Sequence, residues 1–475
     1  PHALHRGRSQ TDPLSIPMNV HFIAIGGAAM HNHALALHHQ GHCVTGSDDA
    51  IHDPSRSRLK AAGLLPDTMG WNPDRIHTDL DKVILGMHAH PDNPELAQAA
   101  KLGVDVVSYP EYLYHAALDK QRVVVAGSHG KTSITAMLLH VMNRLGRTPD
   151  YMVGAQLTGF DRMVQITDAP DMLLEGDEYL SSPVDRTPKF HWYRPHLTIL
   201  TGIAWDHINV FPNPDFYREQ FCEYLRKVEP NGTVVWCEED DELARAVTTI
   251  LPERPDIHWV PYGTPEFSME NGTLQVRIDG VTTPLQLVGT HNALNLAGAM
   301  KLAEAWGVSR ADFLGAVQDF KGAAGRLERA RDMPEKRCTV FRDFAHAPSK
   351  VKATTNSVRD QFGDRKLIAI LELHTFSSLN PEFLPTYAGA LDSADEAWVC
   401  YSPSVLEHKR LPPLDVETVR RAFQRKDLHV VDDHGALLEA TKAAAKPNSV
   451  FLLMSSGRFG GKNLEDAIET TVRAL

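Results

Sequence analysis

The sequence lacks any run of 18 or more apolar residues, which argues against a membrane-spanning helix. Cysteine is scarce: the five cysteines form no CxxC pair, so we expect free thiols in a reducing cytoplasm. Basic residues are outnumbered, with 48 Lys and Arg against 60 Asp and Glu, and this acidic balance argues against a nucleic-acid partner. Residues 1–17 lack an apolar core, so we interpret them as a disordered tail and not as a signal peptide.

What is present is typical of a soluble globular protein: hydrophobic residues make up 43% of the chain and charged residues 23%. A length of 475 residues is too great for one ordinary domain. Short apolar runs lead into turns at 20–30, 122–132 and 339–351, and they alternate with helical patterns. This alternation predicts an α/β fold of parallel sheets covered by helices. We expect three such domains, with boundaries at 18–118, 119–322 and 323–475.

The stretch VVVAGSHGKTSIT (123–135) has the composition of a phosphate-binding loop, although only two residues separate Gly127 from Gly130 where the common P-loop has four. A helix is expected to begin near Lys131, so its N–H groups and dipole converge on the loop. Lys131 can reach a terminal phosphate, and the Thr132 hydroxyl can ligate Mg²⁺. We favour a nucleotide site over a tight strand-to-helix turn with an exposed lysine. The residues of this loop are Gly127, Ser128, His129, Gly130, Lys131, Thr132 and Ser133.

Two further apolar runs of the same predicted domain end in polar residues. The stretch MLLEGDEYLSSP (172–183) holds an apolar strand that ends in Glu175, Asp177 and Glu178, and one or two carboxylates beside a phosphate loop suffice to hold Mg²⁺. A solvated acidic strand end is the alternative. In the stretch 197–212 a strand runs into Asp206 and His207, and this histidine can hold a second cation or a nucleotide oxygen, or can simply be hydrogen-bonded at a strand end.

The carboxyl ends of strands in an open parallel sheet are where ligands bind. Three strand ends with polar chemistry in one domain therefore favour the functional interpretation of His207 and of the carboxylates. The expected metal ligands are Thr132 and Glu175 for Mg²⁺ and His207 for a second cation.

Later segments add groups suited to a nucleotide. Asn292 and Asn295 stand at a helix start, where an amide can read the adenine edge or cap the helix. Arg326 can pair with phosphate or carboxylate oxygens, or it can be a linker charge on the surface. Asp343 and His346 follow in VFRDFAHAP, which can also be an ordinary loop turn.

The first apolar run leads into GGAAM (26–30), which does not satisfy the G-x-G-x-x-G fingerprint of NAD-binding folds. It does fit a helix N-terminus that can hold a diphosphate. The histidines of HNHALALHH (31–39) do not all share one helical face, and no Cys/His ligand set occurs, so a structural metal is not favoured there.

Taken in order, these stretches resemble the Mur ligases, ATP-dependent amide-forming enzymes of peptidoglycan synthesis and recycling. The resemblance runs from Met18 to the end of the chain and includes the family's own short-spaced phosphate loop, GSHGKTS. It implies a Rossmann-like first domain that binds a UDP-sugar acid, a P-loop-type middle domain that binds ATP, and a Rossmann-like third domain that receives the amine. Closure of the domains would bring the three substrates together.

The resemblance also implies roles for individual residues. Lys131, His207 and Arg326 would be catalytic, and ATP would contact the loop together with Asn292, Asn295, Arg326, Asp343 and His346. The UDP-sugar would contact Gly26, Gly27, Ala28, Ala29, Met30, Asp48 and Asn93.

Two sub-types of the family act on UDP-N-acetylmuramate itself. One adds L-alanine, and the murein peptide ligases add the recycled tripeptide L-alanyl-γ-D-glutamyl-meso-diaminopimelate. The segment DEYLSSPVDRTPKFHWYRP (177–195) resembles the tripeptide sub-type, as does SSGRFGG (455–461), so we predict a tripeptide ligase and keep the L-alanine ligase as the alternative. Two departures stand out: FYREQFCEYL (216–225) has no lysine where relatives carry a carbamylated one, and His374 lies where relatives place an arginine-bearing loop.

Other classes of protein make different predictions. An NTPase switch or transport module would hydrolyse ATP without any UDP-sugar, and an NAD-dependent oxidoreductase would bind nicotinamide. A non-catalytic sensor of peptidoglycan precursors would bind UDP-N-acetylmuramate without turnover. The sequence leaves the oligomeric state open between a monomer and a weak dimer.

Overall fold

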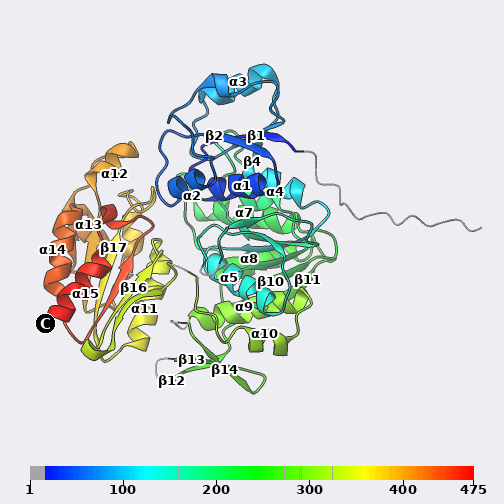
Figure 1. The fold of residues 1–475 in the computed structure, drawn as a ribbon. Coiled ribbons are helices and arrows are strands. Elements are labelled where there is room, and N and C mark those ends of the chain that lie inside the picture. Colours follow the sequence, from blue (N-terminus) through cyan, green and yellow to red (C-terminus); the bar gives the residue numbers. More distant parts are fainter. Residues whose placement is uncertain (1–16, 158–159, 271–272, 288, 290, 324) are drawn as a thin grey trace, which may run out of the picture. The chain divides into compact units, whose positions relative to one another are not determined.

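The computed structural model describes residues 17–157, 160–270, 273–287, 289, 291–323 and 325–475 (Figure 1). Residues 1–16 of the predicted tail lie outside the described residues. The chain divides into two compact units, and the first takes in the chain up to Ala116 together with 164–167 and 181–187. The second unit holds the rest. Across the described ranges, we find no helix with the length and apolar character needed to cross a membrane.

The first unit is built on a parallel sheet with the strand order β2-β1-β3-β4. Strand β1 supplies part of its core, with Phe22 and Ile23 fully buried. The elements of this unit are β1 (Asn19–Ile23), α1 (Ala28–His39), β2 (Cys43–Ser47), α2 (Ser55–Ala61), η1 (Pro73–Arg75), β3 (Lys82–Leu85), α3 (Pro94–Leu102), β4 (Val106–Ser108), α4 (Tyr109–Ala116) and β7 (Val164–Gln165).

A buried carboxyl group supports the turn between β1 and α1. Asp48 follows β2 directly, and its Oδ2 accepts a hydrogen bond of 2.7 Å from the backbone N–H of Gly26. A Cβ at Gly26 would stand 2.9 Å from the same oxygen, so the close approach requires glycine. Burial raises the pKa of Asp48 to about 6, while the Gly26 N–H acts in the opposite direction.

The second unit begins with a parallel sheet. The strands that this unit contributes to the sheet follow the order β11-β10-β9-β5-β8-β6. Its central strand β5 is fully buried at Val123, Val124 and Val125, as expected for a parallel strand covered on both faces. Helices α5 and α9 pack against each other, and so do α7 and α8.

The elements around this sheet are β5 (Gln121–Ala126), α5 (Lys131–Arg144), β6 (Asp150–Met152), β8 (Asp171–Gly176), α6 (Lys189–Trp192), β9 (Leu197–Leu200), α7 (Pro214–Arg226), β10 (Thr233–Cys237), α8 (Asp241–Ile250), β11 (His258–Tyr262), α9 (His291–Ala305) and α10 (Arg310–Ala316). A small antiparallel sheet is formed by β12 (Glu266–Glu270), β13 (Thr273–Ile278) and β14 (Val281–Leu285).

The same unit contains a third large sheet, of order β15-β16-β20-β17-β18-β19, in which only β15 is antiparallel to its neighbour. Two separate apolar clusters lie at this sheet: one includes residues of α11 and α13, and the other includes residues of α14 and α15. Helix α14 lies beside α15 (Figure 1). Its elements are β15 (Glu328–Met333), η2 (Pro334–Lys336), β16 (Cys338–Asp343), α11 (Pro348–Gln361), β17 (Lys366–Glu372), η3 (Leu384–Tyr387), β18 (Glu396–Cys400), α12 (Pro403–His408), α13 (Val416–Phe423), β19 (His429–Val431), α14 (His434–Ala444), β20 (Ser449–Met454), η4 (Phe459–Gly461) and α15 (Leu464–Ala474).

The three large sheets confirm the prediction of an α/β fold with parallel strands covered by helices. The boundaries that we placed between three domains stay predictions. In each large sheet, short apolar runs became central strands because their side chains are removed from water on both faces.

Leu173→Ala should lower the free energy of unfolding by about 2–5 kcal/mol, because Leu173 lies in β8 and is fully buried. Urea denaturation followed by circular dichroism measures the change. Leu251→Ala is the control, since Leu251 is 46% exposed and its truncation should change the free energy by no more than about 0.5 kcal/mol. Equal losses in the two variants would contradict the burial of β8.

Asp48→Asn should remove a pH dependence of stability. The folded pKa of Asp48 lies above its value in the unfolded chain, 3.8, so this group's contribution to stability is fully present below pH 3.8 and is lost as pH rises through 6. Relative to the wild type, the variant should therefore gain stability between pH 4 and pH 7. Urea denaturation across this range tests it, with exposed Asp67→Asn as control. The raised pKa would be contradicted if the wild type and Asp48→Asn differed in free energy of unfolding by the same amount at every pH in this range.

Candidate active site

The loop between β5 and α5 is shaped by two glycines in left-handed conformations. Gly127 has φ +113° and Gly130 has φ +68°. A Cβ at Gly127 would stand 2.3 Å from Thr201 Oγ1, and one at Gly130 would stand 2.3 Å from Asn295 Oδ1. Both positions therefore require glycine for conformation and for space. Asn295, predicted to contact adenine, lies directly against the loop.

Lys131 is the first residue of α5, and its ammonium is held at the loop. Nζ donates to the Gly127 carbonyl at 2.6 Å and to Glu178 Oε2 at 2.6 Å. Burial acts to lower the pKa of Lys131, but the negative charges of Glu178 and Asp177 outweigh it and raise the pKa. The predicted phosphate-binding lysine is therefore charged and pointed toward the strand end that carries the carboxylates.

Thr132 and Glu175 form a hydrogen-bonded pair beside this lysine. The Thr132 hydroxyl donates to Glu175 Oε1 at 2.8 Å, and Glu175 Oε2 accepts from the backbone N–H of Gly154 at 3.0 Å. Both side chains are buried. Because their oxygens already adjoin, the two predicted ligands can share one cation without a change in backbone.

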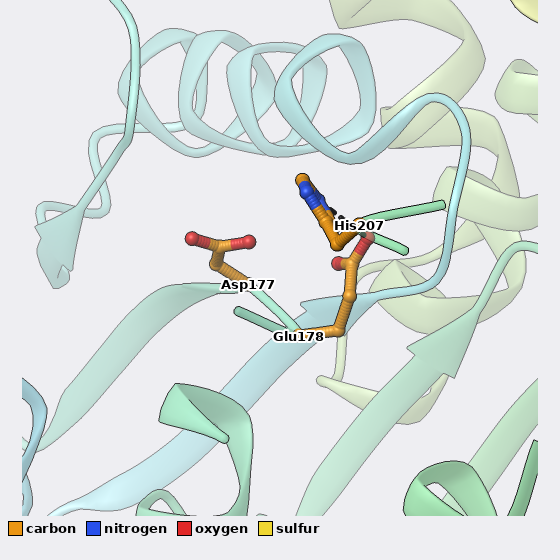
Figure 2. A group of neighbouring side chains, drawn as sticks. All are labelled: Asp177, Glu178 and His207. Carbon is orange, nitrogen blue, oxygen red and sulfur yellow. Dashed lines mark ion pairs between the residues drawn. The ribbon is translucent and has the colours of Figure 1, made fainter. Parts of the chain in front are cut away.

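His207 lies with a different set of carboxylates. Single ligand atoms of Asp177, Glu178 and His207 all lie within 4.8 Å of one another, and Figure 2 shows the imidazole next to the Glu178 carboxylate. The His207 Nε2 atom is 3.8 Å from Glu178 Oε1. His207 has φ +56°, an uncommon conformation outside glycine that is often found at functional sites.

The chemistry of this second group suits a divalent cation. Carboxylate oxygens are the ligands that Mg²⁺ prefers, and an imidazole adds a third donor. Burial raises the pKa of Asp177, but the charges of Lys189 and Lys131 outweigh it and hold the pKa below its usual value. Both carboxyl groups are thus ionised near neutral pH, since the pKa of Glu178 is lowered too: burial opposes this shift and Lys131 drives it.

Groups from the later part of the chain reach the same loop. The Arg326 guanidinium stacks 4.3 Å from the ring centroid of Phe344, and its Nη2 donates to Thr132 Oγ1 at 3.4 Å. The His346 Nε2 atom lies 3.9 Å from Asp206 Oδ2. Burial lowers the pKa of His346 to about 4, so its imidazole is neutral near pH 7. Arg326 and His346, predicted from separate motifs, lie at one site.

The remaining predicted nucleotide contacts have local partners. Asn295 Nδ2 donates to Asn292 Oδ1 at 3.2 Å, and both side chains are buried in the first turns of α9. The Ser128 hydroxyl accepts from the backbone N–H of Ala204 at 2.7 Å. His129 Nε2 lies 2.9 Å from Ser349 Oγ. Ser133 is half-buried in α5, and Asp343 accepts from Thr354 Oγ1 at 2.6 Å.

The residues predicted to bind the UDP-sugar lie in the first unit. Gly27 is the N-cap of α1, which begins at Ala28, and Met30 is buried in its first turn. Asn93 caps α3 instead, because its Oδ1 accepts from the backbone N–H of Glu95 at 2.9 Å. The contact of these residues with a UDP-sugar stays a prediction.

Sequence reasoning missed several groups at the site. Lys189 Nζ donates to Asp177 Oδ2 at 2.5 Å, and the Tyr217 hydroxyl donates to Glu178 Oε1 at 3.0 Å. Lys189 belongs to the segment 177–195, whose pairing of Leu180 with Pro188 returns the chain to the strand end. Tyr217 stands in an ordinary amphipathic helix, where no pattern marks it.

Family models match the chain in three consecutive stretches. The Mur ligase family catalytic domain matches residues 19–121, the Mur ligase middle domain matches 125–303, and the Mur ligase glutamate ligase domain matches 325–457.

Curated relatives match most of the chain. The UDP-N-acetylmuramate–L-alanyl-γ-D-glutamyl-meso-2,6-diaminoheptandioate ligase of Escherichia coli K12 is 27% identical, covering 94% of this chain and 96% of that protein. The UDP-N-acetylmuramate–L-alanine ligase of Chlorobaculum tepidum is 28% identical, covering 92% and 93%. The enzyme of the same name from Arthrobacter sp. FB24 is 31% identical, covering 80% of each chain.

Solved structures show the same fold. The UDP-N-acetylmuramate–alanine ligase of Thermotoga maritima superposes with a TM-score of 0.72 at 22% identity, covering 96% of this chain and 99% of that one. The murein peptide ligase of Psychrobacter arcticus superposes with a TM-score of 0.68 at 22% identity, covering 96% and 98%. With its short phosphate loop, its three consecutive domain matches and a relative 31% identical over most of its length, the chain belongs to the Mur ligase family.

Proposed function

We propose that the protein is an ATP-dependent ligase that joins UDP-N-acetylmuramate to the tripeptide L-alanyl-γ-D-glutamyl-meso-diaminopimelate through an amide bond, in the cytoplasm. The observation that carries the proposal is the meeting of Lys131, the Thr132–Glu175 pair and Arg326 at one glycine loop. Phosphoryl transfer requires positively charged groups and a site for Mg²⁺ around a phosphate loop. Lys131 and Arg326 supply the charged groups, and the Thr132–Glu175 pair supplies the site.

The first step activates the sugar acid. A carboxylate is a poor acyl donor because it would have to expel an oxide ion, so a carboxylate oxygen attacks the γ-phosphorus of ATP. The bond from that phosphorus to the bridging oxygen breaks, ADP leaves with the electron pair, and an acyl phosphate results. Lys131 and Arg326 neutralise the charge that spreads over the phosphoryl oxygens. Mg²⁺, held by Thr132 and Glu175, supplies further charge neutralisation when bound.

The second step forms the amide. The free amine of the tripeptide attacks the acyl carbon, the bond to the phosphate oxygen breaks, and the nitrogen loses a proton. Asp177, Glu178 and His207 would hold a second cation, which would supply positive charge for this step; in its absence, His207 would act directly on the acyl oxygen. We assign orientation of ATP or the amine to Asp343 and His346.

Binding of the remaining substrate groups completes the proposal. The adenine is assigned to Asn292 and Asn295, and the UDP diphosphate to the turn at 26–30. Asp48 and Asn93 flank the nucleotide-sugar.

The choice of the tripeptide is supported by the segment 177–195. Lys189 binds Asp177, and the Tyr179 ring lies 4.9 Å from that of His207, so parts of this segment contribute to the reaction centre. The Escherichia coli relative that names this tripeptide aligns with 94% of the chain.

L-alanine is the second candidate amine. Several relatives of similar identity are named as L-alanine ligases, and the Thermotoga maritima structure is named as an alanine ligase. His374 follows β17, and burial lowers its pKa against the charge of Glu372, so it is a weak partner for a peptide carboxylate at neutral pH. This histidine favours an amine with fewer carboxylates.

Lys131→Ala should lower phosphate release from ATP at least about 100-fold, because no other group would neutralise the phosphoryl oxygens from within the loop. Binding of UDP-N-acetylmuramate, measured by calorimetry, should stay close to that of the wild type. Lys446→Ala, an exposed change in the same unit, is the control. Amide formation at the wild-type rate in Lys131→Ala would sink the mechanism.

Phosphate release with ATP, Mg²⁺ and UDP-N-acetylmuramate should require the tripeptide and should not be supported by free L-alanine. Mass spectrometry of the product confirms the amide. Turnover with L-alanine alone would establish the second candidate, and no turnover with either amine would contradict the ligase. Release without UDP-N-acetylmuramate would instead indicate an NTPase switch or transport module.

A further inference from the structure

The first turn of α11 touches the phosphate loop. The helix begins at Pro348, and no side chain caps its N-terminus at Ala347. Ser349 Oγ lies 2.9 Å from Nε2 of His129 in the loop. The residue that follows Ser349 in this turn is a lysine, so the contact brings a second lysine side chain to the neighbourhood of Lys131.

Lys350 is half-buried, and the charges that act on it belong to the site. They are those of Asp206, Lys131, Glu178 and Arg326. Burial and the charge of Lys350 lower the pKa of the His129 and His346 imidazoles. Both histidines lie at the site through contacts of their own. Within the ranges that the structure describes, the Lys350 ammonium makes no hydrogen bond and no ion pair.

The other lysines at the site differ in this respect. Lys131 is bonded to Glu178 and Lys189 to Asp177, so a carboxylate in contact already offsets each charge. Taking only the described part of the chain, a cation at Lys350 has no such partner, although burying an ammonium without one is unfavourable. The position is therefore suited to an anion that joins the site from outside.

Asp206 supplies an independent sign that the site is incomplete. It is 5% exposed, and its Oδ2 has no hydrogen-bond partner among the described residues. The imidazole of His346, which is neutral near pH 7, lies 3.9 Å from this oxygen. A buried oxygen left without a donor calls for an explanation. The negative charge of Asp206 also acts on the Lys350 ammonium.

We propose that Lys350 is a further catalytic residue, whose ammonium binds non-bridging oxygens of the γ-phosphoryl group while that group moves from ATP to the sugar carboxylate. This inference rests on the proposed function. The lysine gives up no proton in the step. It neutralises charge as the new oxygen–phosphorus bond forms and the bond to the bridging oxygen of ADP breaks.

Three variants at two positions of one helix make a matched test. Lys350→Ala should lower kcat for phosphate release about 100-fold. It should weaken binding of adenylyl imidodiphosphate about tenfold and leave the affinity for ADP unchanged, because only the former carries a γ-phosphoryl group. Lys350→Arg, which keeps the charge, should recover part of the loss. Lys352→Ala, on the same helix but exposed, should behave as the wild type.

A wild-type kcat in Lys350→Ala would overturn the inference. An equal loss of affinity for ADP and for adenylyl imidodiphosphate would also overturn it, because it would indicate a purely structural role. The binding experiment separates this inference from the proposed function. If the wild type forms no amide with either amine, the ligase proposal fails, while the comparison of the two nucleotides still tests the contact with the γ-phosphoryl group.

Discussion

The parallel pairing of β5 with β8 and β9 is the constraint on which the site depends. In this arrangement Ala126 stands level with Gly176 on one side and with Leu200 on the other, so the three strands end together. The phosphate loop follows the first strand, the carboxylates lie at the end of the second, and His207 follows the third. Chemistry that is spread over some eighty residues of sequence is thereby gathered at one edge of one sheet.

Charge governs how that edge is built. The carboxylates of buried Glu178 and half-buried Asp177 have lowered pKa values because each faces a cation: Glu178 faces Lys131, and Asp177 faces Lys189. Removing one member of such a pair leaves a buried charge without compensation, which costs more than the pair contributes. A charge that is removed from water is also attracted more strongly by the opposite charges around it.

The two amines considered for this ligase differ at the far end of the substrate rather than at the reacting bond. In the proposed mechanism, Lys131, Thr132, Glu175 and Arg326 serve phosphoryl transfer whichever amine attacks. Discrimination therefore depends on groups that meet the rest of the peptide. Tyr179 lies next to His207 and Lys189 next to Asp177, whereas His374 lies at the end of β17, in another sheet.

The sequence by itself determined the fold class and the phosphate loop, because both depend on local patterns. Apolar runs predict buried parallel strands, and glycines with a following lysine predict a loop at a helix start; Gly127, Gly130 and Lys131 have these conformations. Only the tertiary structure decided that His207 lies with Asp177 and Glu178, that Thr132 lies with Glu175, and that Lys350 comes to the loop. The physical reason is that contacts between residues far apart in the chain depend on strand order and on helix packing. Neither of these leaves a local pattern in the sequence.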